Sequence, residues 1–356
     1  MAQENPISAY CLSYKRKMPD KETDSSLIDI REDSLLDLSQ EVLESLLRDH
    51  TTGRNIFWAT HDYEALGSEY DYHAPILPHL ITGERGMIIR PRVLKSKENQ
   101  TERAKDKAEV FTPSWICNAQ NNLVDEAWFG RKDVFNVEDT TSHTWQTNPD
   151  KIEFPEGRTW QDYVRATRME ITCGEAPYLV SRYDTTTGVP IPLEQRIGLL
   201  DRKLRVVGEN TETSGDWLDW AQVAYKHTYG YEWQGDNLLL AREALLWTFI
   251  EYYQEKFGER PLLEIINDMA DTISWNLWQM DGLKGVVPDS CHDVVSKNTI
   301  PLEQDLFGVA PPTAPAPQVT PCPGCQKDDI RSHNGTYCKI KDWDTGKEIK
   351  FISLLQ

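Results

Sequence analysis

Three acidic residues lie in or at the ends of segments that the sequence predicts to be β-strands. Glu170 lies in a strand that runs into a tight turn at Gly174, Glu232 belongs to a second strand at 229–233, and Asp281 to a third at 273–282. A small residue directly after a strand lets the backbone approach a bound nucleotide closely. The pattern therefore predicts a nucleotide-type cofactor site at the carboxyl ends of the strands, with an ordinary glycine turn as the alternative.

Cysteine and histidine residues near the end of the chain have the types and spacing of metal ligands. In Cys322-Pro323-Gly324-Cys325 two thiolates can face one ion. The predicted site is a tetrahedral Cys3His zinc site, and Cys291 is an outside candidate for a ligand. A redox Cys-X-X-Cys pair and ordinary free cysteines are the alternatives. The four predicted ligands are Cys322, Cys325, His333 and Cys338.

Residues 169–179 resemble the cofactor motif of amino-methylating DNA methyltransferases, Leu-Asp-Pro-Ala-Cys-Gly-Ser-Gly-Asn-Phe-Leu, and align with it without a gap. The resemblance implies that this segment binds S-adenosylmethionine (SAM). Ala176 stands where the family has its second glycine, and with Pro177 it stiffens the loop. The positions that carry the match are Met169, Glu170, Cys173, Gly174, Ala176, Tyr178 and Leu179.

A second segment supports the same resemblance. Val110-Phe111-Thr112-Pro113 is similar to the Val-(Phe/Tyr)-Thr-Pro sequence that, in this family, introduces a helix lying against the methionine part of the cofactor. We expect Thr112 to cap that helix, Pro113 to occupy its first turn, and Phe111 to offer a flat apolar face. A plain capped helix is the alternative.

The resemblance also implies roles for the second and third strands. Glu232 would accept hydrogen bonds from ribose hydroxyls, Trp233 would stack on adenine, and Asp281 would bind the adenine amino group. Because Glu232 lies far beyond the glycine turn, an insertion at about 182–225 must intervene. Its arginine and lysine residues are expected to form ion pairs with the core rather than to meet nucleic acid.

The chain lacks the catalytic loop of the family, (Asp/Asn/Ser)-Pro-Pro-(Tyr/Phe/Trp). Its one Pro-Pro pair, Pro311-Pro312, lies between Ala310 and Thr313. No residue is therefore assigned the chemical step. A sheet with only the first three strands would also leave its first strand with an open edge. We expect a second polypeptide to supply the Asn-Pro-Pro-Tyr-type loop, and double-stranded DNA to be bound by the complex.

Composition limits the class of protein. The chain has 356 residues, a net charge of −19, no apolar run long enough to span a bilayer and no signal sequence, so we expect a soluble, cytoplasmic protein. The acidic charge argues against strong nonspecific DNA binding by this chain alone. A local basic segment between Arg85 and Lys107 is either a solvated loop or a phosphate contact.

The sequence thus predicts an α/β chain with a Rossmann-like, incomplete SAM-dependent methyltransferase sheet. The predicted parts are an α+β extension at 1–107, the SAM-binding domain at 108–308, a Pro/Ala linker at 309–321 and a zinc-ribbon-like tail at 322–356. The predicted function is that of a subunit of a DNA adenine-N6 methyltransferase in a restriction-modification system. The alternatives are a noncatalytic SAM-binding or anti-restriction protein and a zinc-stabilised scaffold.

Overall fold

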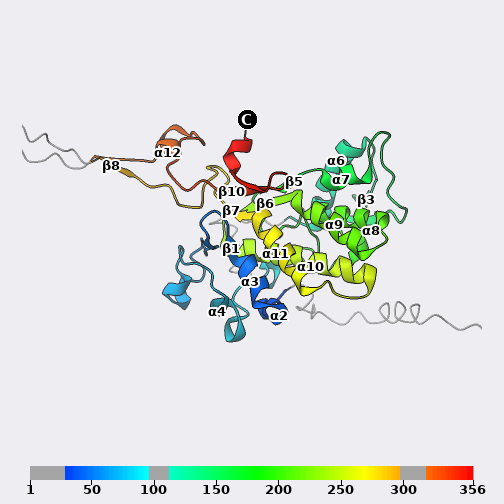
Figure 1. The fold of residues 1–356 in the computed structure, drawn as a ribbon, viewed down its shortest axis with the longest axis horizontal. Coiled ribbons are helices and arrows are strands. Elements are labelled where there is room, and N and C mark those ends of the chain that lie inside the picture. The colour runs from blue at the N-terminus through cyan, green and yellow to red at the C-terminus, as the bar shows by residue number, and fades with distance from the viewer. Residues whose placement is uncertain (1–28, 96–111, 297–317, 356) are drawn as a thin grey trace, which may run out of the picture.

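A parallel sheet of three short strands lies at the centre of the chain. The computed structural model describes residues 29–95, 112–296 and 318–355 (Figure 1). Strands β5 (Arg168–Glu170), β6 (Thr228–Glu232) and β7 (Leu277–Gln279) are hydrogen-bonded in the order β5-β6-β7, and both pairings are parallel. The prediction of an α/β fold with a parallel sheet is therefore confirmed.

The third strand is shorter than the sequence predicted. Residues from Leu263 to Asn276 form helix α11, and the strand takes only the three residues that follow it. Ile266, Met269 and Ile273 recur at helical spacing and are all buried, so the residues from 273 onward continue a helix. The predicted strand at 273–282 was therefore wrong at 273–276, which are helical, and at 280–282, which follow the strand.

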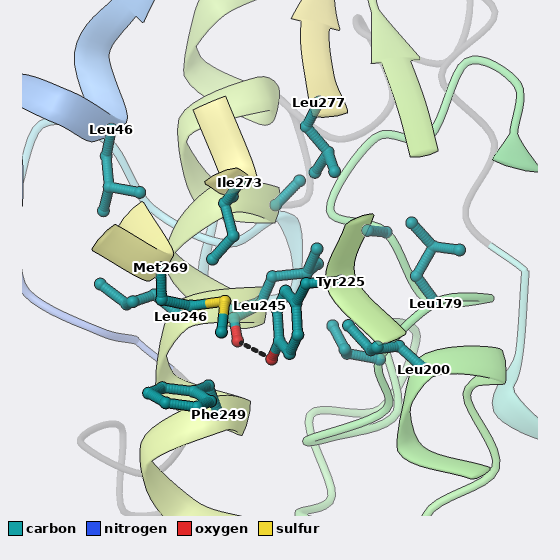
Figure 2. Close-up of a cluster of buried hydrophobic side chains, with 14 of the residues drawn as sticks. Leu46, Leu179, Leu200, Tyr225, Leu245, Leu246, Phe249, Met269, Ile273 and Leu277 are labelled. Carbon is teal, nitrogen blue, oxygen red and sulfur yellow. Dashed lines mark hydrogen bonds between the residues drawn. The ribbon is translucent and has the colours of Figure 1, made fainter. Parts of the chain in front are cut away.

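Four helices fill the connections between the strands. Helices α8 (Leu199–Asn210) and α9 (Ser214–Lys226) join β5 to β6, whereas α10 (Gly235–Phe257) and α11 join β6 to β7. In Figure 1 these helices lie below the strands. Figure 2 shows the core between them and the sheet, where the Tyr225 hydroxyl donates a hydrogen bond to the Leu245 carbonyl oxygen at 2.7 Å.

The opposite face of the sheet is covered by the C-terminal segment. Strands β10 (Lys339–Asp342) and β11 (Lys347–Lys350) form a hairpin that is followed by a short 3-10 helix, η7 (Phe351–Leu354). Side chains alternate between the faces of a strand, so Tyr231 and Trp278 point away from the helices. They pack against Ile340 and Phe351. Strands β6 and β7 are thus covered on both faces.

The N-terminal part packs against the helical side. Ser39 accepts a hydrogen bond from the Glu41 amide and caps α3 (Gln40–Leu47), which packs on α11. Helix α6 (Ser114–Phe129) begins directly after Pro113, which is its N-cap residue, and its first amide, that of Ser114, donates to Asp184 Oδ2 at 2.7 Å rather than to Thr112. The expected capping role of Thr112 was therefore wrong. The remaining elements are α2 (Glu32–Leu38), β1 (Arg48–Asp49), β2 (Arg54–Asn55), α4 (Pro78–Ile81), β3 (Asn136–Asp139), β4 (Thr144–Thr147), α7 (Trp160–Arg165), β8 (Val294–Ser296), β9 (Gln318–Thr320) and α12 (Pro323–Lys327).

Arginines of the predicted insertion form ion pairs with the core. Arg182 and Arg196 both contact Glu251, at 2.8 and 2.6 Å, and Arg202 contacts Asp125 at 2.6 Å. The expectation of ion pairs is confirmed for these three residues. They fix the insertion against α10 and α6.

The predicted domain boundaries stay predictions. Of the predicted linker at 309–321, residues 309–317 lie outside the described residues, and β9 pairs with β8 in an antiparallel ribbon. Most of the basic segment, from 96 onward, also lies outside them. In the part of the chain that the structure describes, no helix is both long and apolar enough to cross a membrane.

Candidate functional site

A cavity of about 1090 Å³ opens at the carboxyl ends of β5 and β6. This volume is in the range of cofactor sites. Phe111 lies outside the described residues, and three further predicted cofactor residues, Pro113, Ala176 and Asp281, do not line the cavity. The predicted residues that do line it are Thr112, Glu170, Cys173, Gly174, Tyr178, Glu232 and Trp233.

The loop after β5 has an unusual backbone. Thr172, Gly174 and Ala176 all have positive φ angles, of 47°, 53° and 58°. This region suits glycine but is costly for a β-branched threonine. The Ala176 amide donates to the Cys173 carbonyl at 2.7 Å, and the Gly174 amide donates to Glu232 Oε2 at 2.9 Å. The loop is therefore a tight turn that is tied to the end of β6.

The two strand-end acids have different tasks. Glu170 accepts hydrogen bonds from the amides of Tyr178 and Leu179, at 3.4 and 3.2 Å, so it fastens the returning loop. Glu232 accepts from the amides of Gly174 and Gln234. Burial raises the pKa of both carboxyls, and the backbone N–H groups oppose this shift. A carboxyl group has more acceptor positions than these bonds occupy, so Glu232 can also accept from a ligand.

Cys173 and Ala176 support the turn from behind. Both side chains are buried. Burial raises the pKa of the Cys173 thiol well above its usual range, so the residue is a packing thiol and not a nucleophile. A β-carbon at Gly230 would lie 3.3 Å from Cys173 Sγ, so the glycine on β6 makes room for that thiol.

The N-terminal part of the chain forms a further wall of the cavity. The sequence did not predict this wall. It consists of residues 59–62 and Tyr72. The Trp233 indole N–H donates to the Tyr72 hydroxyl at 2.9 Å. Burial, together with a hydrogen bond to Asp289, raises the pKa of Tyr72 to about 12. No motif marks these residues, because only the tertiary fold brings them to the strand ends.

Asp281 lies outside the cavity and closes a turn. Its Oδ1 accepts from the amides of Leu283 and Lys284, at 3.0 and 3.2 Å, and its Oδ2 contacts Lys284 Nζ at 3.0 Å. Strand β7 ends two residues earlier, and at its end the Gln279 side chain donates to the carbonyls of Phe57 and Trp233. Asp281 is therefore not among the residues that line this cavity, and its role at the adenine stays a prediction.

Strand β5 has one open edge. Among the described residues it pairs only with β6. Met169 and Ile171 on this strand and just after it are 45% and 62% exposed, and Val124, which lines the same cavity, is 38% exposed. Such an edge with apolar side chains around it favours pairing with another strand.

The second candidate site is a Cys3His cluster that could bind a metal. The ligand atoms of Cys291, Cys322, Cys325 and His333 all lie within 4.8 Å of one another. Each of the three Sγ atoms is 3.6 Å from His333 Nδ1. Ordinary zinc bond lengths and tetrahedral angles give a sulfur–nitrogen separation of about 3.6 Å. The cluster thus has the dimensions of a tetrahedral site.

Glycines and backbone amides shape this cluster. A β-carbon at Gly324 would lie 2.5 Å from His333 Nδ1, so only glycine permits this approach. Burial acts to raise the pKa of Cys322, but hydrogen bonds from the amides of Asn334 and Cys325 outweigh it and lower the pKa to about 6. The thiolate is the form that binds metals.

The fourth ligand differs from the one expected. Cys338 is buried against the sheet, where its Sγ donates to the Gln279 carbonyl at 3.4 Å, and burial raises its pKa. Cys291, which the sequence offered only as an outside candidate, completes the cluster. Cys291 precedes β8, so its approach to the knuckle depends on the fold and not on local spacing.

Comparisons with known proteins do not assign the chain to a family. No protein-family model matches the chain, and neither the curated proteins nor the solved structures include a significant match.

Proposed function

We propose that this chain is the SAM-binding subunit of a DNA adenine-N6 methyltransferase of the restriction-modification type, with a Rossmann-like sheet. The observation that carries the proposal is the cavity at the carboxyl ends of β5 and β6. Residues that the sequence places far apart, at 112, 170–174, 177–178 and 232–233, line one cavity there. The resemblance assigns most of these same positions to the cofactor.

The residues of the cavity fit a nucleoside with a charged tail. Glu232 has acceptor positions left for ribose hydroxyls, and the half-buried Trp233 offers an aromatic face for adenine. The turn at Gly174 allows the cofactor to approach the backbone. SAM would supply a methyl group. The chain itself offers binding and orientation, and no residue of it is assigned the transfer step.

The same proposal includes a second polypeptide. Its support is the open edge of β5, with Met169 and Ile171 exposed beside it. A partner strand paired with β5 would cover these side chains and bring an Asn-Pro-Pro-Tyr-type loop to the cavity, which Met169 and Ile171 also line. Because the net charge of this chain is −19, the partner would also provide most of the contact with DNA.

We further infer that the Cys3His cluster holds zinc in a structural role. Three thiolates and one imidazole suit zinc, and four protein ligands leave no open position for catalysis. Metal analysis should find one zinc ion per chain. Cys291→Ser should lose the metal and Cys338→Ser should keep it. The opposite result would restore Cys338 to the ligand set.

The test of SAM binding is a calorimetric titration of the purified chain. We expect micromolar affinity, on the order of −8 kcal/mol. Glu232→Gln should weaken binding about tenfold, because a charged acceptor is lost. Glu212→Gln, an exposed position outside the cavity, is the matched control. Equal affinity for all three proteins would place the ligand elsewhere, and the absence of heat from the wild type would contradict a preformed site.

A noncatalytic SAM-binding protein is the second candidate function. The missing catalytic loop favours it. It requires the same cavity but no partner strand on β5. Met169→Glu together with Ile171→Glu would leave its mass in solution unchanged, whereas the same change should release the partner from a split enzyme. Because both residues line the cavity, the mass in solution and not the SAM affinity is the readout.

A further inference from the structure

We propose that the metal at the Cys3His cluster positions one wall of the cavity, so that loss of the metal weakens ligand binding there. The identity of the ligand rests on the proposed SAM site, but the mechanical link does not. The link runs from the cluster through residues 285–292 to Gln279, Tyr72 and Trp233. In Figure 1 helix α12, which contains Cys325 and directly follows Cys322, lies away from the sheet, while β10 lies beside it.

The metal would add a cross-link between two segments that also contact each other through backbone hydrogen bonds and the β8–β9 ribbon. Cys291 comes from one segment, and Cys322, Cys325 and His333 from the other. The His292 amide donates to Asn334 Oδ1 at 3.1 Å, and Asn334 Nδ2 donates to the His292 carbonyl at 2.7 Å. These hydrogen bonds are exposed to solvent, so they contribute little stability by themselves. Four metal bonds would hold Cys291 and its neighbours at this place more firmly than these two exposed hydrogen bonds do.

The cross-linked segments are fastened to the sheet. The Val287 amide donates to the Thr336 carbonyl at 2.8 Å, and the Cys338 amide donates to the Gly285 carbonyl at 3.0 Å. Val287 and Cys338 also pack with Tyr231 and Trp278 on the face of the sheet opposite the helices. Residues 285–292 are therefore in direct contact with the ends of β6 and β7. A loss of order in these residues would also loosen the strand ends.

Gln279 connects this region to both sides of the cavity. Its side-chain amide donates to the carbonyls of Phe57 and Trp233, at 2.9 and 2.8 Å, and its Oε1 accepts from the Phe57 amide at 3.0 Å. Trp233 lines the cavity, and the chain after Phe57 forms the wall at 59–62. Gln279 is buried, so this amide is a fixed bridge between the two walls.

Asp289 provides a second connection. It lies two residues before Cys291 and hydrogen-bonds the Tyr72 hydroxyl. The same hydroxyl accepts a hydrogen bond from the Trp233 indole at 2.9 Å. The φ angle of Asp289 is 51°, a conformation that an unrestrained chain rarely holds. Release of Cys291 from the metal would free this residue and remove one support of Tyr72.

The experiment compares the metal-loaded chain with the chelated chain by amide hydrogen exchange, without SAM. We expect chelation to accelerate exchange about tenfold at 57–62 and 232–235, since local opening sets these rates, and added zinc to reverse the change. Cys291→Ser should behave like the chelated chain. His292→Ala, which alters the neighbouring exposed side chain and no ligand, should behave like the wild type.

A SAM titration of the same samples supplies the functional readout, with an expected several-fold rise in Kd on chelation. Loss of protection at 334–338 would show that chelation has disordered the cluster. If exchange at 57–62 and 232–235 is unchanged in that chain, the inference is overturned. A purified chain that neither contains nor takes up zinc would overturn it as well. If SAM does not bind at all, the proposed function fails, and the exchange comparison still decides whether the metal orders the wall.

Discussion

The cavity at the sheet and the Cys3His cluster are held in place by different forces. Glu170 and Glu232 at the cavity are fixed by backbone N–H groups and by a core that covers both faces of β6 and β7. At the cluster, three thiols and one imidazole face mainly one another. The first region should therefore keep its shape without a ligand, whereas the second should depend on its metal.

The largest effect should follow from removing a metal ligand. We expect Cys322→Ser to release the metal and to destabilise the C-terminal segment by more than about 3 kcal/mol, because metal binding and folding are coupled in small sites. Chemical denaturation followed by Trp fluorescence would measure this loss. Cys173→Ser is the comparison at the other site, and it should leave the metal content unchanged. Loss of metal from both variants would show that the two regions do not differ in their dependence on the metal.

A smaller change tests the same dependence through packing. Gly324→Ala would place a β-carbon 2.5 Å from His333 Nδ1, so the imidazole must move out of position. We expect zinc affinity to fall about 10- to 100-fold, as for other changes that misorient a ligand. Competition with a chromophoric chelator measures the affinity. Gly215→Ala, where no atom lies near the new β-carbon, is the control and should bind zinc as the wild type does.

Much of the cavity was predictable because its residues follow local rules. Gly174 and Glu232 lie at strand ends, and such positions can be recognised from short patterns. The start of β7 was misjudged because an apolar run does not distinguish the end of a helix from the start of a strand. Tyr72 and Cys291 join their sites only through long-range packing. No spacing in the sequence marks them.

Asp201 of helix α8 should make the stability of the fold depend on pH. Burial raises the pKa of Asp201 to about 6, although its Oδ2 accepts from Ser181 and Gly198. The folded state thus binds a proton that the unfolded state releases at lower pH, so stability falls as pH rises from about 4 to about 6. The raised pKa corresponds to about 2–3 kcal/mol. Asp201→Asn should flatten that decline in a urea-unfolding series, and a parallel decline in both proteins would contradict this assignment.

The smallest effect should come from one hydroxyl in the core of Figure 2. The Tyr225 hydroxyl donates to the Leu245 carbonyl at 2.7 Å and is fully buried. Tyr225→Phe removes one hydrogen bond while keeping the ring, so we expect a loss of about 1 kcal/mol in the free energy of unfolding. Metal content and SAM affinity should not change. A change in either would show that the core and the sites are coupled more tightly than the contacts indicate.

The most direct test of the central claim is to locate bound SAM on the chain. Ultraviolet irradiation of the complex with labelled SAM, followed by peptide mapping, reports which segments contact the cofactor. We expect the label within residues 168–182 and 228–237, with excess unlabelled SAM abolishing it. Label confined to the Cys3His region, or label that unlabelled SAM does not displace, would contradict a cofactor site at the strand ends.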